Sequence, residues 1–323
     1  MQHKFLNFMN ETPLFTGCGT AMVTPFKNGE VDFDAFSTLV RRQLDAGIHF
    51  LVPLATTGEA PCLENDEKLQ LLVRCREITD KHEHEGGKHT PLLVGAGTNS
   101  LKQTIRNIEF FSPHGADAFL VVVPYYNKPT QKGQYEYFKA VAESTDKPVI
   151  IYNVPGRTGA NMEAATCIRL AEDVPNIVGI KEASGRFSQI ADILAGVPES
   201  FSVLSGDDDL TMSIMTAGAS GVISVASNVV PELIVDFVEA LGAPKICGGK
   251  AECEMDICRS SELFYRLRPL FSACFVESNP IPVKAALAEM GLIHNELRLP
   301  LMPCDSKTAE LMRNVLKDLG CIK

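Results

Sequence analysis

Short apolar runs alternate along this chain with amphipathic segments of helical period, from residue 17 to about residue 228. Each run holds three to six residues and is flanked mostly by polar residues, glycine or proline, which is typical of strands buried in a parallel sheet. The predicted strands cover residues 20–23, 50–54, 91–94, 118–123, 148–152, 177–180, 202–204 and 221–224. Helical periods separate them, for instance over residues 32–47, 65–81, 131–144 and 163–172.

Eight strands that alternate with helices predict an α/β fold in which a parallel sheet closes into a (β/α)8 TIM barrel. An open, doubly wound sheet is the alternative. The residues after the eighth unit read as helix throughout, with starts near Pro231, Glu252, Pro280 and Ser306 and no returning strand signal. The predicted organisation is an N-terminal extension over residues 1–15, a catalytic barrel over 16–229 and a C-terminal helical subdomain over 230–323.

Composition narrows the class of protein. With 45% hydrophobic and 22% charged residues, the chain of 323 residues is able to bury a large core. A net charge of -10 and no basic stripe argue against nucleic acid and anionic membranes as partners. No signal peptide and no apolar run of about eighteen residues is found, so we expect a cytoplasmic protein. The 10 cysteines form no C-x-x-C pair and read as small core residues.

Two polar stretches resemble ligand sites only superficially. Residues 81–89 group three histidines with carboxylates, but the stretch is broken by glycines between a helix and a strand. A solvated connection is the favoured interpretation, and a metal site is the alternative. Gly95-Ala96-Gly97 lacks the third glycine of a dinucleotide loop and the Gly-Lys-Ser/Thr of a phosphate loop.

The strongest chemical signal is Lys181, which directly follows the sixth apolar run. A free lysine has a pKa of about 10.4, and burial disfavours the charged form, so an apolar setting supplies the neutral amine that attacks a carbonyl. Taken alone, a lysine at the end of a strand more often reaches into solvent. The other strand ends change that balance.

Polar groups follow most of the predicted strands, at the edge where the active site of a parallel barrel forms. Each has a structural alternative: the threonines could cap a helix, the tyrosines could pack in the core, and the arginine could be a surface cation. Together with Lys181 they favour one shared site. These stretches are Ala55-Thr-Thr-Gly-Glu59, Pro124-Tyr-Tyr-Asn127, Tyr152-Asn-Val-Pro-Gly-Arg157, Ser205-Gly-Asp-Asp208 and Ile223-Ser224.

From Gly17 to about Leu319 the sequence resembles the dihydrodipicolinate synthase and N-acetylneuraminate lyase family of class I pyruvate-dependent aldolases. One departure is Ala55, where many relatives have glycine. The motifs that carry the resemblance are Thr56-Thr-Gly-Glu59, Pro124-Tyr-Tyr-Asn127, Tyr152-Asn-Val-Pro-Gly-Arg-Thr158, Gly179-Ile-Lys-Glu-Ala183, Leu204-Ser-Gly-Asp-Asp208, Gly221-Val-Ile-Ser-Val225 and Asn279-Pro-Ile-Pro-Val-Lys284.

The resemblance implies condensation of pyruvate with L-aspartate 4-semialdehyde to 4-hydroxy-tetrahydrodipicolinate, an entry step to diaminopimelate and lysine. Lys181 would form the imine, and Tyr152 would donate and accept protons. Thr56 would link Tyr152 to Tyr126, which in the family reaches in from a neighbouring subunit. Such a relay suits the chemistry, because a phenol with a pKa near 10 is a poor base without hydroxyl partners.

The resemblance also implies substrate-binding roles. Thr57 and the backbone at Ile223 would hold the pyruvate carboxylate, Gly206 would lie beside the substrate, and Arg157 would grip the carboxylate of the semialdehyde. No metal or organic cofactor is expected, because the protonated imine is itself the electron sink. The shared relay implies a homotetramer built as two dimers. A related pyruvate-dependent 2-keto acid aldolase and a non-catalytic barrel are the alternative functions.

Relatives that are inhibited by lysine carry a regulatory pocket, which maps here onto Ala60, Pro61, Asn65, Lys68, Asn99, Gln103 and Tyr125. Gln103 stands in place of a carboxylate, and Lys68 stands in place of a mostly neutral histidine. Both changes disfavour a ligand ammonium group, so the resemblance implies weak or absent inhibition by L-lysine.

Overall fold

The computed structural model describes residues 13–243, 245–247, 250–252 and 254–323. Most of the predicted N-terminal extension, residues 1–12, lies outside the described residues. Phe15 is buried: its ring packs edge-on against that of Phe50, with 5.3 Å between the ring centroids. The last residues of the predicted extension therefore cover the end of the barrel where the strands begin.

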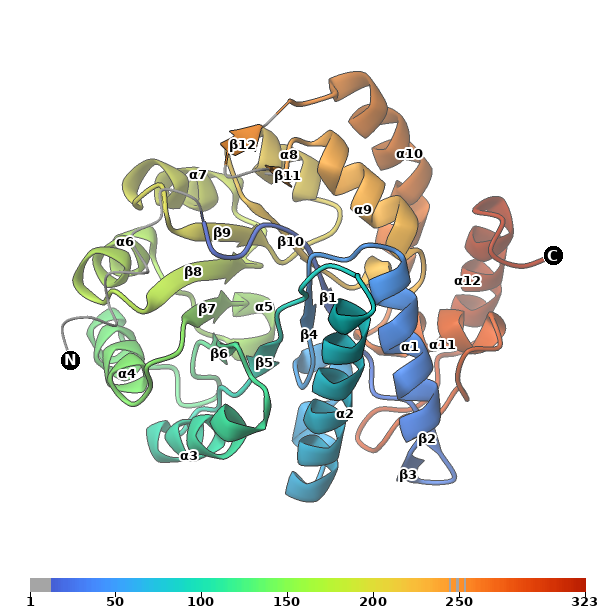
Figure 1. The fold of residues 1–323 in the computed structure, drawn as a ribbon, viewed down its shortest axis with the longest axis horizontal. Helices are drawn as coiled ribbons and strands as arrows, with labels where there is room; N and C mark the ends of the chain where they lie inside the picture. The colour runs from blue at the N-terminus through green and yellow to red at the C-terminus, as the bar shows by residue number, and fades with distance from the viewer. Residues whose placement is uncertain (1–12, 244, 248–249, 253) are drawn as a thin grey trace.

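Eight parallel strands form the centre of the molecule, and helices surround them (Figure 1). The sheet order is β4-β1-β10-β9-β8-β7-β6-β5, and a parallel bridge between Leu51 and Leu92 joins its two edges. The predicted TIM barrel is confirmed, and the open sheet is wrong. The strands are β1 (Gly17–Ala21), β4 (Phe50–Val52), β5 (Leu93–Gly95), β6 (Ala118–Val122), β7 (Val149–Asn153), β8 (Ile177–Glu182), β9 (Ser202–Ser205) and β10 (Gly221–Ser224).

The helices follow the strands in regular alternation, with short pieces beside the mouth of the barrel. The predicted helix over 65–81 continues to residue 84, and the predicted helix near 252 begins five residues later. The helices are α1 (Phe33–Asp45), α2 (Asn65–His84), α3 (Leu101–Phe111), α4 (Gln131–Glu143), α5 (Pro155–Thr158), α6 (Ala164–Asp173), α7 (Phe187–Gly196), α8 (Thr211–Thr216), α9 (Pro231–Ala240), α10 (Ile257–Ala273), α11 (Ile281–Glu289) and α12 (Ser306–Asp318).

Two apolar clusters explain why the strands read as continuous hydrophobic runs. Side chains alternate across a strand, so Ile150 faces the barrel interior and Ile151 faces the surrounding helices. The interior cluster extends from Phe15 and Phe50, where the strands begin, to Tyr152 near the carboxyl ends of the strands. Both faces of each strand are therefore buried, as is typical of a parallel barrel.

Two hairpins were not predicted. The first joins β2 (Phe26–Lys27) to β3 (Glu30–Val31) through Asn28 and Gly29, which both have positive φ angles. Asn-Gly between short strands is a strong hairpin signal, so the sequence did contain the evidence for it. The second, β11 (Lys245–Cys247) with β12 (Lys250–Glu252), lies in the tail. The expectation of helix throughout the tail was wrong.

In the tail, α9 packs against β1 and α10, and α12 packs against α10 and α11. Figure 1 shows α12 at the edge of the molecule opposite α4 and α6. The division of the chain at residue 229 stays a prediction. Four of the cysteines, Cys18, Cys75, Cys167 and Cys274, are buried free thiols. No helix within the described part of the chain is long and apolar enough to cross a membrane.

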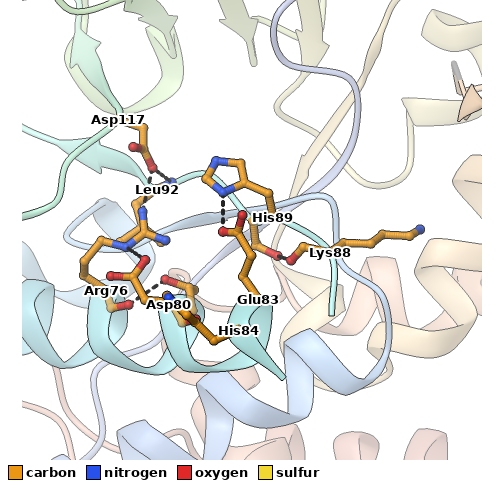
Figure 2. Close-up of polar contacts among 10 residues, drawn as sticks. Arg76, Asp80, Glu83, His84, Lys88, His89, Leu92 and Asp117 are labelled. Carbon is orange, nitrogen blue, oxygen red and sulfur yellow. Dashed lines mark hydrogen bonds and ion pairs between the residues drawn. The ribbon is translucent and has the colours of Figure 1, made fainter. Parts of the chain in front are cut away.

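The histidine-rich stretch, residues 81–89, begins in the last turn of α2 and makes local pairs (Figure 2). His89 Nδ1 lies 2.7 Å from a carboxylate oxygen of Glu83, and His84 Nδ1 lies 2.6 Å from the backbone oxygen of Asp80. The described residues contain no group of three or more histidine, cysteine, aspartate or glutamate side chains that could hold a metal ion.

Beside this stretch, Asp117 fastens the end of α2 to the start of β5. Its carboxylate accepts a hydrogen bond from the Leu92 backbone amide at 2.8 Å and forms an ion pair with Arg76 at 3.0 Å (Figure 2). Arg76 also pairs with Asp80 at 2.8 Å. We therefore assign this region a structural role.

Candidate active site

Lys181 lies inside β8 rather than just beyond it, because the strand continues to Glu182. Its neighbours across the sheet are Tyr152 on β7 and Leu204 on β9. The lysine side chain is buried, and burial lowers its pKa to about 8. The carboxylate of Asp208 opposes this shift, and the cation of Arg157 adds to it. About a tenth of the amine is therefore neutral at pH 7, far more than for a free lysine with a pKa of about 10.4.

Tyr152 is the residue of the site whose side chain is best suited to transfer protons. The ammonium nitrogen of Lys181 lies 4.4 Å from the centre of the tyrosine ring. Burial raises the pKa of the phenol, whereas the Arg157 cation and a hydrogen bond with the Thr56 side chain lower it. Thr56, Tyr152 and Lys181 are thus brought together, as predicted from three separate strand ends.

A cavity of about 460 Å³ opens at the carboxyl ends of the strands. Its wall includes Thr56, Tyr152, Arg157 and Asn279, whereas Lys181 reaches the site through its contact with the Tyr152 ring. Arg157 is exposed at α5, and its guanidinium donates a hydrogen bond to the backbone oxygen of Asn279 at 3.2 Å. The arginine therefore stands at the mouth, with much of its donor capacity free.

Thr57 is buried in a short 3-10 turn, η2 (Thr56–Gly58). Its hydroxyl oxygen accepts a hydrogen bond from the side-chain amide of Asn279 at 2.9 Å. This hydrogen bond uses a lone pair of the hydroxyl oxygen and not its proton. The hydroxyl of Thr57 can therefore still donate a hydrogen bond to an anionic ligand.

Gly206 directly follows β9 and Ile223 lies in β10, and neither belongs to the cavity wall. A Cβ atom at Gly206 would lie 2.7 Å from Cβ of Ala183 and 3.1 Å from Cε of Lys181. The absence of a side chain there leaves room for the lysine. Ile223 is buried in β10 and belongs to the same interior cluster as Tyr152.

Tyr126 is the one predicted catalytic residue that does not join the others within this subunit. Its side chain is 88% exposed, and its backbone has a φ of 69°, in the left-handed region. The adjacent Tyr125 lines the cavity, whereas Tyr126 does not. The site of the single chain is therefore built from Lys181, Tyr152 and the turn η2 (Thr56–Gly58), called the threonine turn below, without Tyr126.

Two residues of the site were not assigned roles from the sequence. Asp208 is buried, and its carboxylate accepts hydrogen bonds from the backbone amides of Val225 and Ala226, both at 3.0 Å. Asn279 contacts both Thr57 and Arg157 from the tail of the chain. Both residues lie within motifs quoted above, but residue type alone does not show a contact over such sequence distances.

A buried lysine of lowered pKa beside a buried phenol, at the mouth of a TIM barrel, is the arrangement expected of an enzyme that forms a Schiff base with a carbonyl substrate. Residues 14–319 match the model of the Dihydrodipicolinate synthetase family. The chain belongs to this family, and the predicted family is confirmed.

Curated relatives match over nearly the whole chain. A 4-hydroxy-tetrahydrodipicolinate synthase of Thermotoga neapolitana is 47% identical over 312 residues, which cover 96% of this chain and 100% of the relative. The enzyme of the same name from Koribacter versatilis is 44% identical over 309 residues, which cover 95% and 97%. These relatives bear out the predicted function, that of a lyase in lysine and diaminopimelate biosynthesis.

Solved structures agree with both the fold and the family. The crystal structure of dihydrodipicolinate synthase from Thermotoga maritima is 46% identical, covers 96% of this chain and 100% of its own, and superposes with a TM-score of 0.88.

The lowered pKa of Lys181 has a measurable consequence. With pyruvate and borohydride, the rate of adduct formation should rise as Lys181 loses its proton and level off above about pH 8 to 9. Mass spectrometry of the reduced adduct, sampled over time at each pH, gives this rate, and samples without pyruvate supply the background. A rate that still climbs beyond pH 10 would show an ordinary, solvated lysine.

Proposed function

We propose that this protein condenses pyruvate with L-aspartate 4-semialdehyde through an imine on Lys181, giving 4-hydroxy-tetrahydrodipicolinate. The observation that carries the proposal is the buried Lys181 amine held against the ring of Tyr152. The sequence of curated relatives over nearly the full chain supports the same reaction. The cytoplasmic location expected from the sequence is part of this proposal.

The first half of the reaction needs several proton transfers at one carbon. The neutral Lys181 amine attacks the keto carbon of pyruvate, and the carbonyl oxygen leaves as water once it has received two protons. Loss of a methyl proton then gives the enamine. Tyr152 is placed to carry these protons, because the Thr56 side chain acts on its phenol and the reacting nitrogen lies 4.4 Å from the centre of its ring.

The second half joins two carbons. The enamine carbon attacks the aldehyde of the semialdehyde, and the new alkoxide takes up a proton. The amino group of the semialdehyde then attacks the iminium carbon, which closes the ring of the product and displaces the amine of Lys181. Thr57 and the backbone at Ile223 hold the pyruvate carboxylate in this proposal, and Gly206 leaves space beside the lysine. Arg157 receives the second carboxylate at the mouth, where a planar, permanent cation forms paired hydrogen bonds.

The proposal is tested by locating the imine. Borohydride reduction in the presence of pyruvate should add one pyruvate-derived group to the peptide that contains Lys181. The internal control is Lys284, the other buried lysine among the residues whose burial is described, which is already paired with Glu59 at 2.6 Å. A label on Lys284, or no label, would refute the assignment of Lys181.

A substitution at Arg157 distinguishes the roles of the two substrate-binding regions. Arg157→Ala should still form the pyruvate imine but lose semialdehyde turnover, because the arginine acts on the second substrate. A charged hydrogen-bonded contact is worth about 1.5 to 3 kcal/mol, roughly ten- to a hundredfold in kcat/KM. The control is Arg313→Ala on α12, which removes an arginine outside the cavity. Equal loss of imine trapping in Arg157→Ala would show a structural role instead.

Assembly follows from the position of Tyr126. We infer a homotetramer of two dimers, in which Tyr126 of each subunit completes the proton relay of its neighbour. Its exposed side chain supports this, since it is out of reach of its own site. A structure described as a monomeric dihydrodipicolinate synthase variant is 46% identical to this chain, so other states occur among relatives.

Tyr126→Phe removes one hydroxyl and is expected to leave assembly unchanged while slowing imine formation by about tenfold or more. Light scattering reports assembly, and rapid quenching with borohydride reports the rate. Tyr265→Phe, at another exposed tyrosine on α10, is the matched control and should change neither. A wild-type monomer with full activity would contradict the shared site.

The predicted regulatory pocket overlaps the cavity in part. Ala60, Pro61, Lys68 and Tyr125 line it. Lys68 is half-buried, and burial lowers its pKa, an effect that Glu64 and Glu67 oppose. Gln103 is exposed, and its amide donates a hydrogen bond to Asn107 at 2.9 Å. The enzyme of Cyanidioschyzon merolae, 35% identical, has been solved with lysine bound.

We propose that L-lysine inhibits this protein weakly or not at all. Loss of a carboxylate partner at Gln103 and a like charge at Lys68 each weaken binding by on the order of 1 kcal/mol or more. Activity measured against rising L-lysine checks this, and Gln103→Glu is expected to strengthen inhibition by restoring a carboxylate. Inhibition of the wild type in the submillimolar range, unchanged by Gln103→Glu, would contradict the proposal.

A further inference from the structure

Lys284, on α11, is a fully buried lysine that the proposed reaction does not use. Its ammonium nitrogen lies 2.6 Å from a carboxylate oxygen of Glu59, and both side chains have no exposed surface. It also donates a hydrogen bond to the backbone oxygen of Thr24 at 2.9 Å and lies 4.2 Å from the centre of the Phe26 ring. Buried ion pairs are weak sources of stability, because desolvation offsets the attraction. A role other than stability is therefore worth seeking.

Glu59, the partner of Lys284, ends the threonine turn. Its backbone has a φ of 51°, in the left-handed region, which is unfavourable for a residue with a side chain. Its two carboxylate oxygens are both engaged: one contacts Lys284, and the other accepts a hydrogen bond from the backbone amide of Arg298 at 3.1 Å. The strained end of the turn is thus held from the tail of the chain.

A second contact runs from Lys284 to the same turn. The Thr24 backbone oxygen accepts from Lys284, and the Thr24 hydroxyl donates to the backbone oxygen of Gly58 at 2.7 Å. The ammonium group of Lys284 therefore acts on two consecutive residues, Gly58 and Glu59. Lys284 does not line the cavity. Its ammonium group contacts the cavity wall through Glu59, which is a lining residue.

The residues held in this way directly follow the two threonines of the site. The Thr56 side chain acts on the Tyr152 phenol and lowers its pKa, and Thr57 presents its hydroxyl from the adjacent position. The strength of a hydrogen bond falls steeply with poor geometry, and small displacements of reacting groups cost large factors in rate. A turn released at residues 58 and 59 would therefore misplace both threonines.

We propose that Lys284 is a positioning residue, which acts through Glu59 and Thr24 to keep Thr56 against Tyr152 and Thr57 in line for the pyruvate carboxylate. This inference rests on the proposed function. It assigns to α11 of the tail a part in the reaction of the barrel, although Lys284 itself touches no substrate.

The main test uses the double variant Glu59→Gln/Lys284→Met, which removes both charges together and keeps an acceptor for Arg298. Imine formation with saturating pyruvate should slow by at least about tenfold, and the KM for pyruvate should rise by at least about threefold. Because the Thr56 contact lowers the pKa of Tyr152, its loss should also move the limb of the kcat profile that reports Tyr152 to higher pH.

Thr24→Val provides a second, milder variant if the double variant does not fold. It removes the hydroxyl that holds Gly58 and keeps the shape of the side chain. The same parameters should change in the same direction, by about threefold to tenfold. Unchanged kinetics and pH profile in a folded Glu59→Gln/Lys284→Met protein, or in Thr24→Val when the double variant is unfolded, would overturn the proposal.

Leu316→Ala controls for lost stability. Leu316 is fully buried on α12, away from the turn, so its truncation should lower the unfolding midpoint without changing the pH profile or the KM for pyruvate. If Leu316→Ala reproduced the kinetic changes of the other variants, Lys284 would be structural only. Failure of the wild type to trap pyruvate on Lys181 would instead refute the proposed function, which separates the two outcomes.

Discussion

Desolvation of one amine is the constraint on which the site depends. Lys181 is placed inside the barrel by β8, where neighbouring strands and the Tyr152 ring keep water away from its nitrogen. The free-energy cost of burying a cation then favours the neutral amine, which lowers the pKa to about 8. Asp208 limits this shift, because its carboxylate favours the charged form. The balance of these two effects suits an amine that must both attack a carbonyl and later carry an iminium charge.

Such a site needs many buried polar groups, and each requires a partner. Asp208 accepts hydrogen bonds from two backbone amides at the start of the segment after β10. Glu59 accepts hydrogen bonds from the Lys284 side chain and the Arg298 backbone amide. These contacts differ in kind from the apolar packing of the barrel, because a hydrogen bond constrains direction as well as distance. The polar groups therefore give the mouth of the barrel a defined geometry that hydrophobic burial alone does not supply.

The tail of the chain takes part in this geometry. Asn279 meets Thr57 and Lys284 meets Glu59, and each of these contacts joins residues more than two hundred positions apart. Asn279 also meets Arg157. Helices in the tail would otherwise look like a separate layer added to a complete barrel. Their contacts instead suggest that the barrel and the tail form the site together.

The sequence by itself determined the barrel, its strand order along the chain and most of the site, because hydrophobic period and position after a strand depend on local residue order. Only the tertiary structure decided which buried lysine is held in an ion pair. Lys181 and Lys284 are both buried, but Lys284 faces a carboxylate and Lys181 faces a phenol ring. Likewise Tyr126 is exposed and does not line the cavity of its own subunit, which its residue type does not reveal. Charge pairing and burial arise from groups far apart in sequence, so no local pattern records them.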